Sequence, residues 1–228
     1  MTMPFYVPPE QVMKDRADYA RKGIARGRSL IAMSGSDGIV LVAENPSRTL
    51  YKISEIYDRI AFAGVGKYNE FEMLRIAGVR QADVKGYSFA REDVNARSLA
   101  NGYAQTLGQV FTHEMKPYEV EILVAQVGAT PDDDEMFQIL YDGVVNDKEG
   151  YTVLGGQAET VEELLQQRYQ ARLDLGAAVK LGAAVVAGPD GSPLQANQLE
   201  VAMLDRQRTR RAFRRIKGDE LESLLASG

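Results

Sequence analysis

Few side chains in this sequence have the chemistry of a catalytic or metal-binding group. There is no cysteine among the 228 residues, which excludes thiol catalysis and disulfide bonds. His113 is the single histidine, so sites built from several histidines are excluded, and we expect it at a helix end near Glu114. Ser34 and Ser36 lie in the segment Ser34–Gly38, which is typical of a hairpin turn and not of a nucleophile elbow.

One glycine-rich segment, Gly64-Val65-Gly66-Lys67, resembles the end of a phosphate-binding loop. The leading glycine of that motif would fall at Ala61, which is not a glycine. The position of the magnesium-binding Ser or Thr is occupied by Tyr68. We therefore predict no nucleotide site and no other cofactor.

Two runs of like charge could each bind a partner. The acidic run Asp132–Glu135 could hold a cation, but four consecutive acids are typical of a solvated loop. The basic run consists of Arg206, Arg208, Arg210, Arg211, Arg214, Arg215 and Lys217. No aromatic stacking platform accompanies it and the net charge of the chain is −5, so we predict a charged turn and an exposed edge strand instead of a nucleic-acid site.

The N-terminus offers one more candidate nucleophile. If Met1 were removed, Thr2 would combine a free amine with a hydroxyl, as in an N-terminal nucleophile hydrolase. Such a nucleophile must begin a strand held inside a sheet, whereas Thr2 begins a proline-rich lead of about eight residues that precedes a helix. We predict no catalytic residue in this chain.

The elements that position these residues follow from apolar spacing and turn signals. We predict strands at Ser29–Met33, Ile39–Ala43, Ile60–Gly64, Glu119–Val127, Met136–Tyr141, Tyr151–Leu154, Leu199–Leu204 and Ala212–Ile216. We predict helices from Pro9 to about Ile24, over Asp93–Met115, from a capping box at Thr160 and Glu163 through Tyr169, over Leu175–Ala187, and from Asp219 through Leu225. The stretch Ile53–Ile60 should supply further core residues.

The order of these elements predicts the fold class. Strands grouped in hairpins and helices grouped in pairs favour an α+β fold, a layered αββα sandwich of two antiparallel sheets between helix pairs. With 45% hydrophobic residues, residues 1–228 can form a single domain. We find no apolar run long enough for a membrane span and no signal-peptide pattern, so we expect a cytoplasmic protein without membrane contact.

Several segments resemble the proteasome subunit family. They include Tyr103-Ala104-Gln105, Lys116-Pro117-Tyr118-Glu119-Val120 and Tyr141-Asp142-Gly143. Residues 43–59, the segment Gly66-Lys67-Tyr68-Asn69-Glu70-Phe71 and the opening helix, residues 9–26, are similar to the actinobacterial α-type branch of the core (20S) proteasome. The resemblance covers nearly the whole chain and implies the N-terminal nucleophile hydrolase-like sandwich of that family.

The family has two types of subunit, and the resemblance implies the non-catalytic one. The β type is cut to expose a threonine at the start of its first strand. Here Arg28 stands at about that position, and the helix of residues 9–26 precedes it. An α-type subunit keeps such a helix.

The resemblance also implies partners and a site. Subunits of the α type form heptameric rings that cap two β rings, and residues Thr2, Met3, Pro4, Phe5, Tyr6, Val7 and Pro8 would form the gate of the axial pore. An ATPase ring and an ATP-independent ring would act as activators by inserting C-terminal tails between neighbouring α subunits. Lys52 matches the family lysine that meets the tail carboxylate, and Gly27 and Lys67 match positions that line the pocket.

Two other functions stay open on the sequence alone. The chain could be an active threonine protease subunit of the same fold, which the absence of a threonine at the start of the first strand opposes. It could also be a stand-alone scaffold protein with no protease partner, which co-purification with a β subunit would distinguish.

Overall fold

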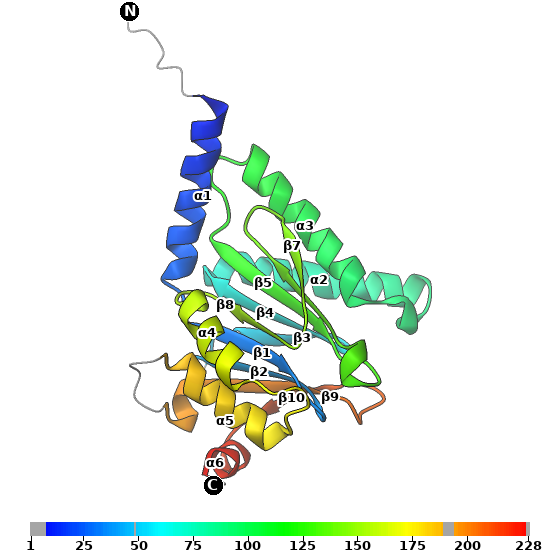
Figure 1. The fold of residues 1–228 in the computed structure, drawn as a ribbon. Helices are drawn as coiled ribbons and strands as arrows, with labels where there is room; N and C mark the ends of the chain where they lie inside the picture. The colour runs from blue at the N-terminus through cyan, green and yellow to red at the C-terminus, as the bar shows by residue number, and fades with distance from the viewer. Residues whose placement is uncertain (1–7, 48, 189–193, 227–228) are drawn as a thin grey trace, which may run out of the picture.

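The computed structural model describes residues 8–47, 49–188 and 194–226 (Figure 1). Within this part of the chain, ten strands form two five-stranded antiparallel sheets. The first sheet has the order β10-β9-β2-β1-β8, with bounds β1 (Leu30–Ser34), β2 (Gly38–Glu44), β8 (Tyr151–Leu154), β9 (Leu199–Asp205) and β10 (Phe213–Ile216). The second has the order β3-β4-β5-β6-β7, with bounds β3 (Ile53–Tyr57), β4 (Ile60–Gly66), β5 (Val120–Gln126), β6 (Glu135–Ile139) and β7 (Val145–Lys148).

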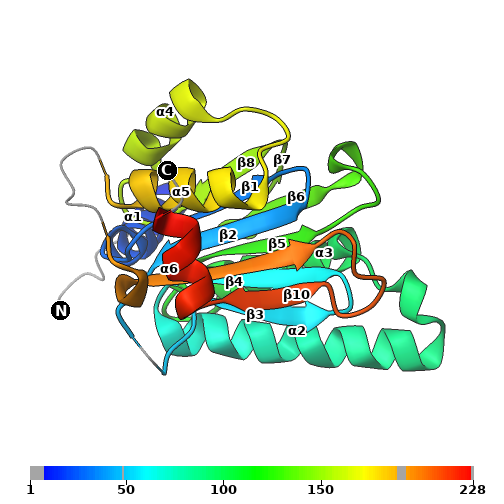
Figure 2. The same cartoon turned by 90° about the horizontal axis from the view of Figure 1, so that it is seen from below.

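Helices cover the outer faces of both sheets (Figure 2). The second sheet is covered by α2 (Tyr68–Ser88) and α3 (Ala96–His113), and the first by α4 (Ala158–Arg168), α5 (Leu175–Val186) and α6 (Asp219–Ala226). Three apolar clusters follow from this layering, one between the sheets and one under each helical layer. Strands β1 and β2 lie between two of these clusters, so nearly every residue in them is buried. The predicted αββα sandwich is confirmed.

The helix α1 (Pro9–Ala25) stands apart from the two layers and projects from one end of the sandwich (Figure 1). It begins with Pro9 at its first position, where a missing N–H costs no helical hydrogen bond. Only Ala20 and Ile24 are buried, both near its C-terminal end. The Arg16 guanidinium donates to the carbonyl oxygen of Glu114, and it stacks on Phe111, so α1 is also attached to the end of α3.

One predicted helix start is wrong in detail. Thr160 was expected to cap its helix, but α4 begins at Ala158, and its N-cap residue is Gln157 in the left-handed conformation. The preceding Gly155 has φ +100° and directs the chain into the helix earlier than the capping signal indicated. The last helix begins at Asp219, where it was predicted to begin. Strand β7 was not predicted, because its sequence Val-Asn-Asp-Lys has no apolar alternation.

Candidate functional site

Lys52 lies in the connection between β2 and β3, one residue before β3 begins. Its ammonium Nζ donates to the carbonyl oxygen of Arg28 at 2.9 Å, and its own carbonyl accepts from the N–H of Gly64 at 2.9 Å. Burial lowers the pKa of Lys52 to about 8, although the carboxylates of Glu200 and Glu44 oppose that shift. Among the described residues, no carboxylate forms a direct ion pair with this ammonium. Within the described part of the chain, the ammonium is therefore held by a backbone carbonyl and by no carboxylate.

Gly27 joins the end of α1 to β1. Its N–H donates to Ile24, and its carbonyl accepts from the N–H of Gly156 at 3.0 Å. A Cβ at this position would lie 3.0 Å from the Ile24 oxygen and 3.3 Å from the backbone nitrogen of Gly66. A larger residue here would have to push the connection between β4 and α2 away, so the close approach depends on glycine.

Lys67 is the N-cap residue of α2, and about half of its side chain is exposed. Its backbone N–H donates to Glu119 at 2.9 Å, and its Nζ lies 3.7 Å from Oε1 of the buried Glu70. The same Glu70 carboxylate accepts from Lys116 Nζ at 2.8 Å and from the Glu119 N–H at 2.7 Å. Glu70 therefore fixes the start of α2 against the start of β5.

The structure brings the three predicted pocket residues to the same end of the sandwich. Lys52 contacts Arg28, the residue next to Gly27, and Gly27 packs against Gly66, the residue next to Lys67. The predicted gate is different, because Thr2 to Val7 lie outside the described residues. Pro8 is described, is exposed and precedes the first turn of α1.

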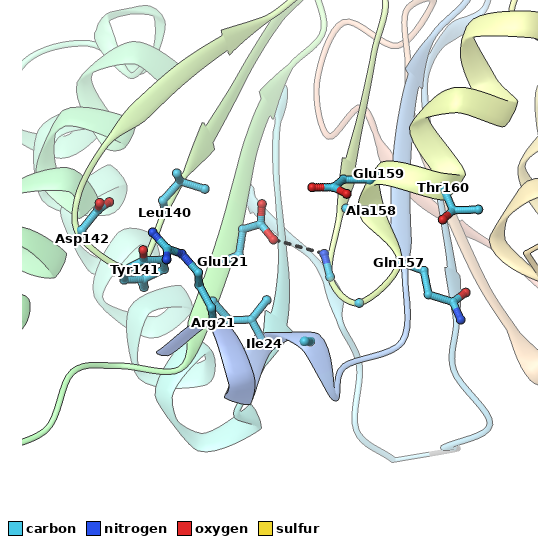
Figure 3. Close-up of a pocket in the computed structure, with 13 residues that line it drawn as sticks. Arg21, Ile24, Glu121, Leu140, Tyr141, Asp142, Gln157, Ala158, Glu159 and Thr160 are labelled. Atoms are coloured by element: carbon cyan, nitrogen blue, oxygen red, sulfur yellow. Dashed lines mark hydrogen bonds between the residues drawn. The ribbon is translucent and has the colours of Figure 1, made fainter. Parts of the chain in front are cut away.

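A cavity of about 500 Å³ opens beside this end of the molecule, between α1, the start of α4 and the turn after β6 (Figure 3). At its floor, the buried Glu121 carboxylate accepts from the Gly155 N–H at 3.1 Å and from the Gln138 side-chain amide. Burial raises the pKa of Glu121. Both oxygens of this carboxylate accept hydrogen bonds within the chain, so Glu121 stabilises the turn between β8 and α4.

Gly64 and Gly66, which resemble the glycines of a phosphate loop, allow close packing of neighbouring groups. A Cβ at Gly64 would overlap Phe71, and Gly66 has φ +100° with the Glu119 carbonyl against it. The Lys67 N–H that such a loop would turn toward a phosphate donates to that Glu119 carbonyl. His113 ends α3 as predicted, with its Nδ1 3.3 Å from the Gln109 carbonyl oxygen.

The acidic and basic runs were predicted to be solvated, and this is wrong for one residue of each. The side chains of Asp134 and Arg206 are 2% and 9% exposed and form an ion pair at 2.7 Å. Ser34 Oγ also donates to Asp134, at 2.6 Å. Arg206 further donates to the carbonyl oxygens of Gly35, Ser36, Gly128 and Thr130. The strand that carries the end of the basic run, β10, is at the edge of its sheet, as predicted.

The described residues contain no group of three or more acidic or histidine side chains arranged to hold a metal ion. In the same part of the chain, no helix is both long and apolar enough to cross a membrane.

Comparison with known proteins identifies the family. The family model described as "Proteasome subunit" matches residues 24–204. A protein named "Proteasome subunit alpha" from Sanguibacter keddieii is 62% identical over all of this chain and 91% of its own length. Proteins of the same name from Thermomonospora curvata and Acidimicrobium ferrooxidans are each 57% identical, over 100% and 99% of this chain and 100% and 97% of their own lengths.

The chain belongs to the proteasome subunit family. Its resemblance to the actinobacterial α-type branch is confirmed, since all three of these relatives carry that name. In this α-type subunit, Arg28 lies two residues before β1 and forms an ion pair with Glu44 at 2.7 Å. Its amide nitrogen is bonded to Gly27 and so is not a free amine. The segment that precedes β1 therefore carries a paired cation at Arg28.

Sequence reasoning missed one residue that shapes the site of this proteasome subunit. Glu200 is buried on β9, and its carboxylate accepts hydrogen bonds from four donors. A signal was present, because Glu200 has the same parity on β9 as Ala202 and Leu204, which face the core between the sheets. A carboxylate on that face needs partners, and the sequence does not say which residues supply them.

Proposed function

We propose that this chain is a non-catalytic α-type subunit of a bacterial core proteasome. The observation that carries the proposal is the identity of 57–62% to proteins named proteasome subunit alpha over essentially the full chain, α1 included. All 228 residues act as one proteasome-type domain, and seven copies form an outer ring on a ring of β subunits. The particle works in the cytoplasm. Arg28, two residues before β1, supports a subunit that encloses and controls the protease without cutting peptide bonds.

The ring has two tasks, gating and docking. Thr2 to Pro8 form the gate, and proline and aromatic residues in this segment suit packing between copies around the pore. Activators, one an ATPase ring and one independent of ATP, insert C-terminal tails between neighbouring subunits. The tail carboxylate binds Lys52, with Gly27 and Lys67 lining the pocket. The close packing of Gly27 on Gly66 supports this assignment, and so does the Lys52 ammonium, which bonds to the Arg28 carbonyl and to no carboxylate of the described residues.

Assembly with a β subunit tests the proposal. The purified chain alone should hydrolyse no fluorogenic peptide, whereas co-expression with an actinobacterial β subunit should give a large particle that does. A threonine-directed inhibitor should label only the β chain. Labelling of this chain would favour an active threonine protease subunit, and failure to co-purify with β would favour a stand-alone scaffold.

Deletion of Thr2 to Pro8 tests the gate separately. The truncated subunit should assemble normally, since α1 and the two sheets remain. The particle should then degrade long peptides faster than the full-length one, while hydrolysis of a short peptide by the unchanged β sites stays similar. Equal rates of long-peptide entry would show that this segment is not the barrier.

A further inference from the structure

The backbone that carries Lys52 is held by a carboxylate on the opposite sheet. Oε2 of Glu200 accepts from the N–H of Lys52 at 2.8 Å and from Asn45 Nδ2 at 2.7 Å. Oε1 accepts from the N–H of Ile53 at 3.1 Å and from Arg215 Nη1 at 2.8 Å. Both oxygens of one buried carboxylate are thus engaged by backbone and side-chain donors.

Arg215, on the neighbouring strand β10, holds the same connection. Glu200, Arg215 and Asn45 are together called the clamp below. Its Nη2 donates to the carbonyl oxygen of Ile53 at 2.6 Å, and its guanidinium stacks on the ring of Tyr51 at 3.9 Å. Asn45 adds a bond from its Nδ2 to the Leu50 carbonyl at 2.7 Å. Residues on both sides of Lys52 are therefore tied to β9 and β10, while no carboxylate of the described residues holds its ammonium.

We propose that Glu200 is a positioning residue for Lys52, which fixes the backbone of the connection so that the ammonium stands ready for a tail carboxylate. This rests on the proposed function of Lys52. A preorganised cation binds an anion more tightly, because less conformational entropy is lost on binding. A lysine on an unclamped connection would have the same charge but would have to be ordered by each arriving tail.

The two acidic residues near the Lys52 ammonium allow the effect of backbone position to be measured separately from the effect of charge. Glu200 and Glu44 both favour the charged lysine, and Arg28 opposes it. Glu44 is paired with Arg28, and Glu200 is the carboxylate that bonds the backbone at Lys52. Arg215, the remaining nearby cation, is paired with Glu200. A variant of Glu44 therefore removes a negative charge of the same kind without opening the clamp.

The experiment uses the assembled α–β particle and a synthetic peptide that ends in an activator-like C-terminal carboxylate. The measured quantity is the peptide concentration that gives half-maximal stimulation of long-peptide hydrolysis, at pH 6.5, where Lys52 is charged. Glu200→Gln should raise this concentration about tenfold, as expected for loss of one to two hydrogen bonds of positioning, with basal hydrolysis unchanged. Glu44→Gln, the matched control, should leave it within about twofold, a difference of only a few tenths of a kcal/mol.

Glu200→Asp distinguishes position from charge, since it keeps the charge but cannot span the same four donors. It should behave like Glu200→Gln, and a normal response of both Glu200 variants would overturn the inference. If the Glu200 variants do not assemble, Asn45→Ser removes one donor with less disturbance and should raise the concentration about threefold. An unchanged response of Asn45→Ser would then overturn the proposal.

Lys52→Ala keeps this test separate from the proposed function. If Lys52→Ala loses stimulation and the Glu200 variants respond normally, the docking role stands and the positioning role is wrong. If the Lys52→Ala particle is stimulated normally, the docking role is wrong and the inference that rests on it is overturned as well.

Discussion

Each of two regions of this subunit is organised around a buried carboxylate, and they use it differently. At the tip of the β1–β2 hairpin, Asp134 and Arg206 are buried as an ion pair, and Arg206 ties the hairpin to two other loops. At the other region, Glu200 binds backbone N–H groups and Arg215, while the nearby Lys52 ammonium has no direct carboxylate partner among the described residues. The first arrangement pairs both charges within a structural network, and the second leaves the Lys52 cation bonded to a backbone carbonyl alone.

The comparison of these two regions predicts that removal of Arg206 has the largest effect on the free energy of unfolding. Arg206→Ala leaves the Asp134 charge buried without its partner and removes bonds to four carbonyl groups. Breaking a buried pair in this way costs about 3–5 kcal/mol. Urea unfolding of the isolated chain should show that loss in the free energy of unfolding. A loss below 1 kcal/mol would mean that this network of ion pair and hydrogen bonds contributes little to the stability of the fold.

Removing Lys52 should affect docking and spare the fold. A charge-assisted hydrogen bond of this kind contributes on the order of 1.5–3 kcal/mol, so Lys52→Ala should weaken binding of a tail peptide roughly tenfold to a hundredfold. Particle size and basal peptide hydrolysis should be unchanged. Lys217→Ala removes an exposed lysine and is the control, and a tail peptide with an amidated C-terminus should mimic Lys52→Ala on the wild-type particle.

The pH dependence of docking sharpens the contrast further. The pKa of Lys52 is lowered from its ordinary value to about 8, so its charge is present below pH 8 and is lost as the pH rises through that value. Tail-peptide stimulation should therefore be constant from pH 6 to 7 and weaken above pH 8, approaching tenfold for each further unit. An arginine keeps its charge throughout, so in a Lys52→Arg particle any remaining stimulation should lack this decline. The same decline in both particles would assign it to another group.

The smallest change in the free energy of unfolding is expected for a substitution at Arg211, on the same β9–β10 hairpin that carries Arg206. Arg211 pairs with Glu55 at 3.1 Å, but its side chain is 78% exposed. Solvent and salt screen such a pair, so Arg211→Ala should cost less than about 1 kcal/mol in urea unfolding. It is also the matched control for Arg206→Ala, since both variants remove one arginine from one hairpin. Equal losses in the two variants would contradict the contrast between buried and exposed pairs.

The sequence predicted most elements of the layers because they follow from local periodicity, but it predicted no helix at α2 (Tyr68–Ser88). The hairpin at Asp37-Gly38 forms as expected, and Gly38 adopts a φ of +145°. The roles of Arg206 and Glu200 could not be predicted, because their partners lie 72 and 148 residues away at Asp134 and Lys52. In a basic run, a buried arginine has the same local signature as an exposed one. Only the folded arrangement decides which of them meets a carboxylate.

The candidate site was predicted from the family resemblance, because the chemistry and spacing of its residues alone do not indicate a binding site. Lys52 has the sequence context of an ordinary surface lysine, and its distinguishing property is the set of neighbours that Gly27 and Gly64 bring to it. Glu200 could have been noticed, since a glutamate of the same parity as Ala202 faces the core. Its four donors come from three separate segments, which no pattern within one strand records.

The clamp on Ile53 has a consequence for how this chain avoids unwanted association. Strand β3 is at the edge of its sheet, where unpaired backbone groups can recruit a strand from another molecule. At Ile53 the outward N–H is taken by Glu200 and the outward carbonyl by Arg215. Two side chains thus occupy the place that a sixth strand would need. The pair that orders the connection before β3 also protects the end of that strand from edge-to-edge aggregation.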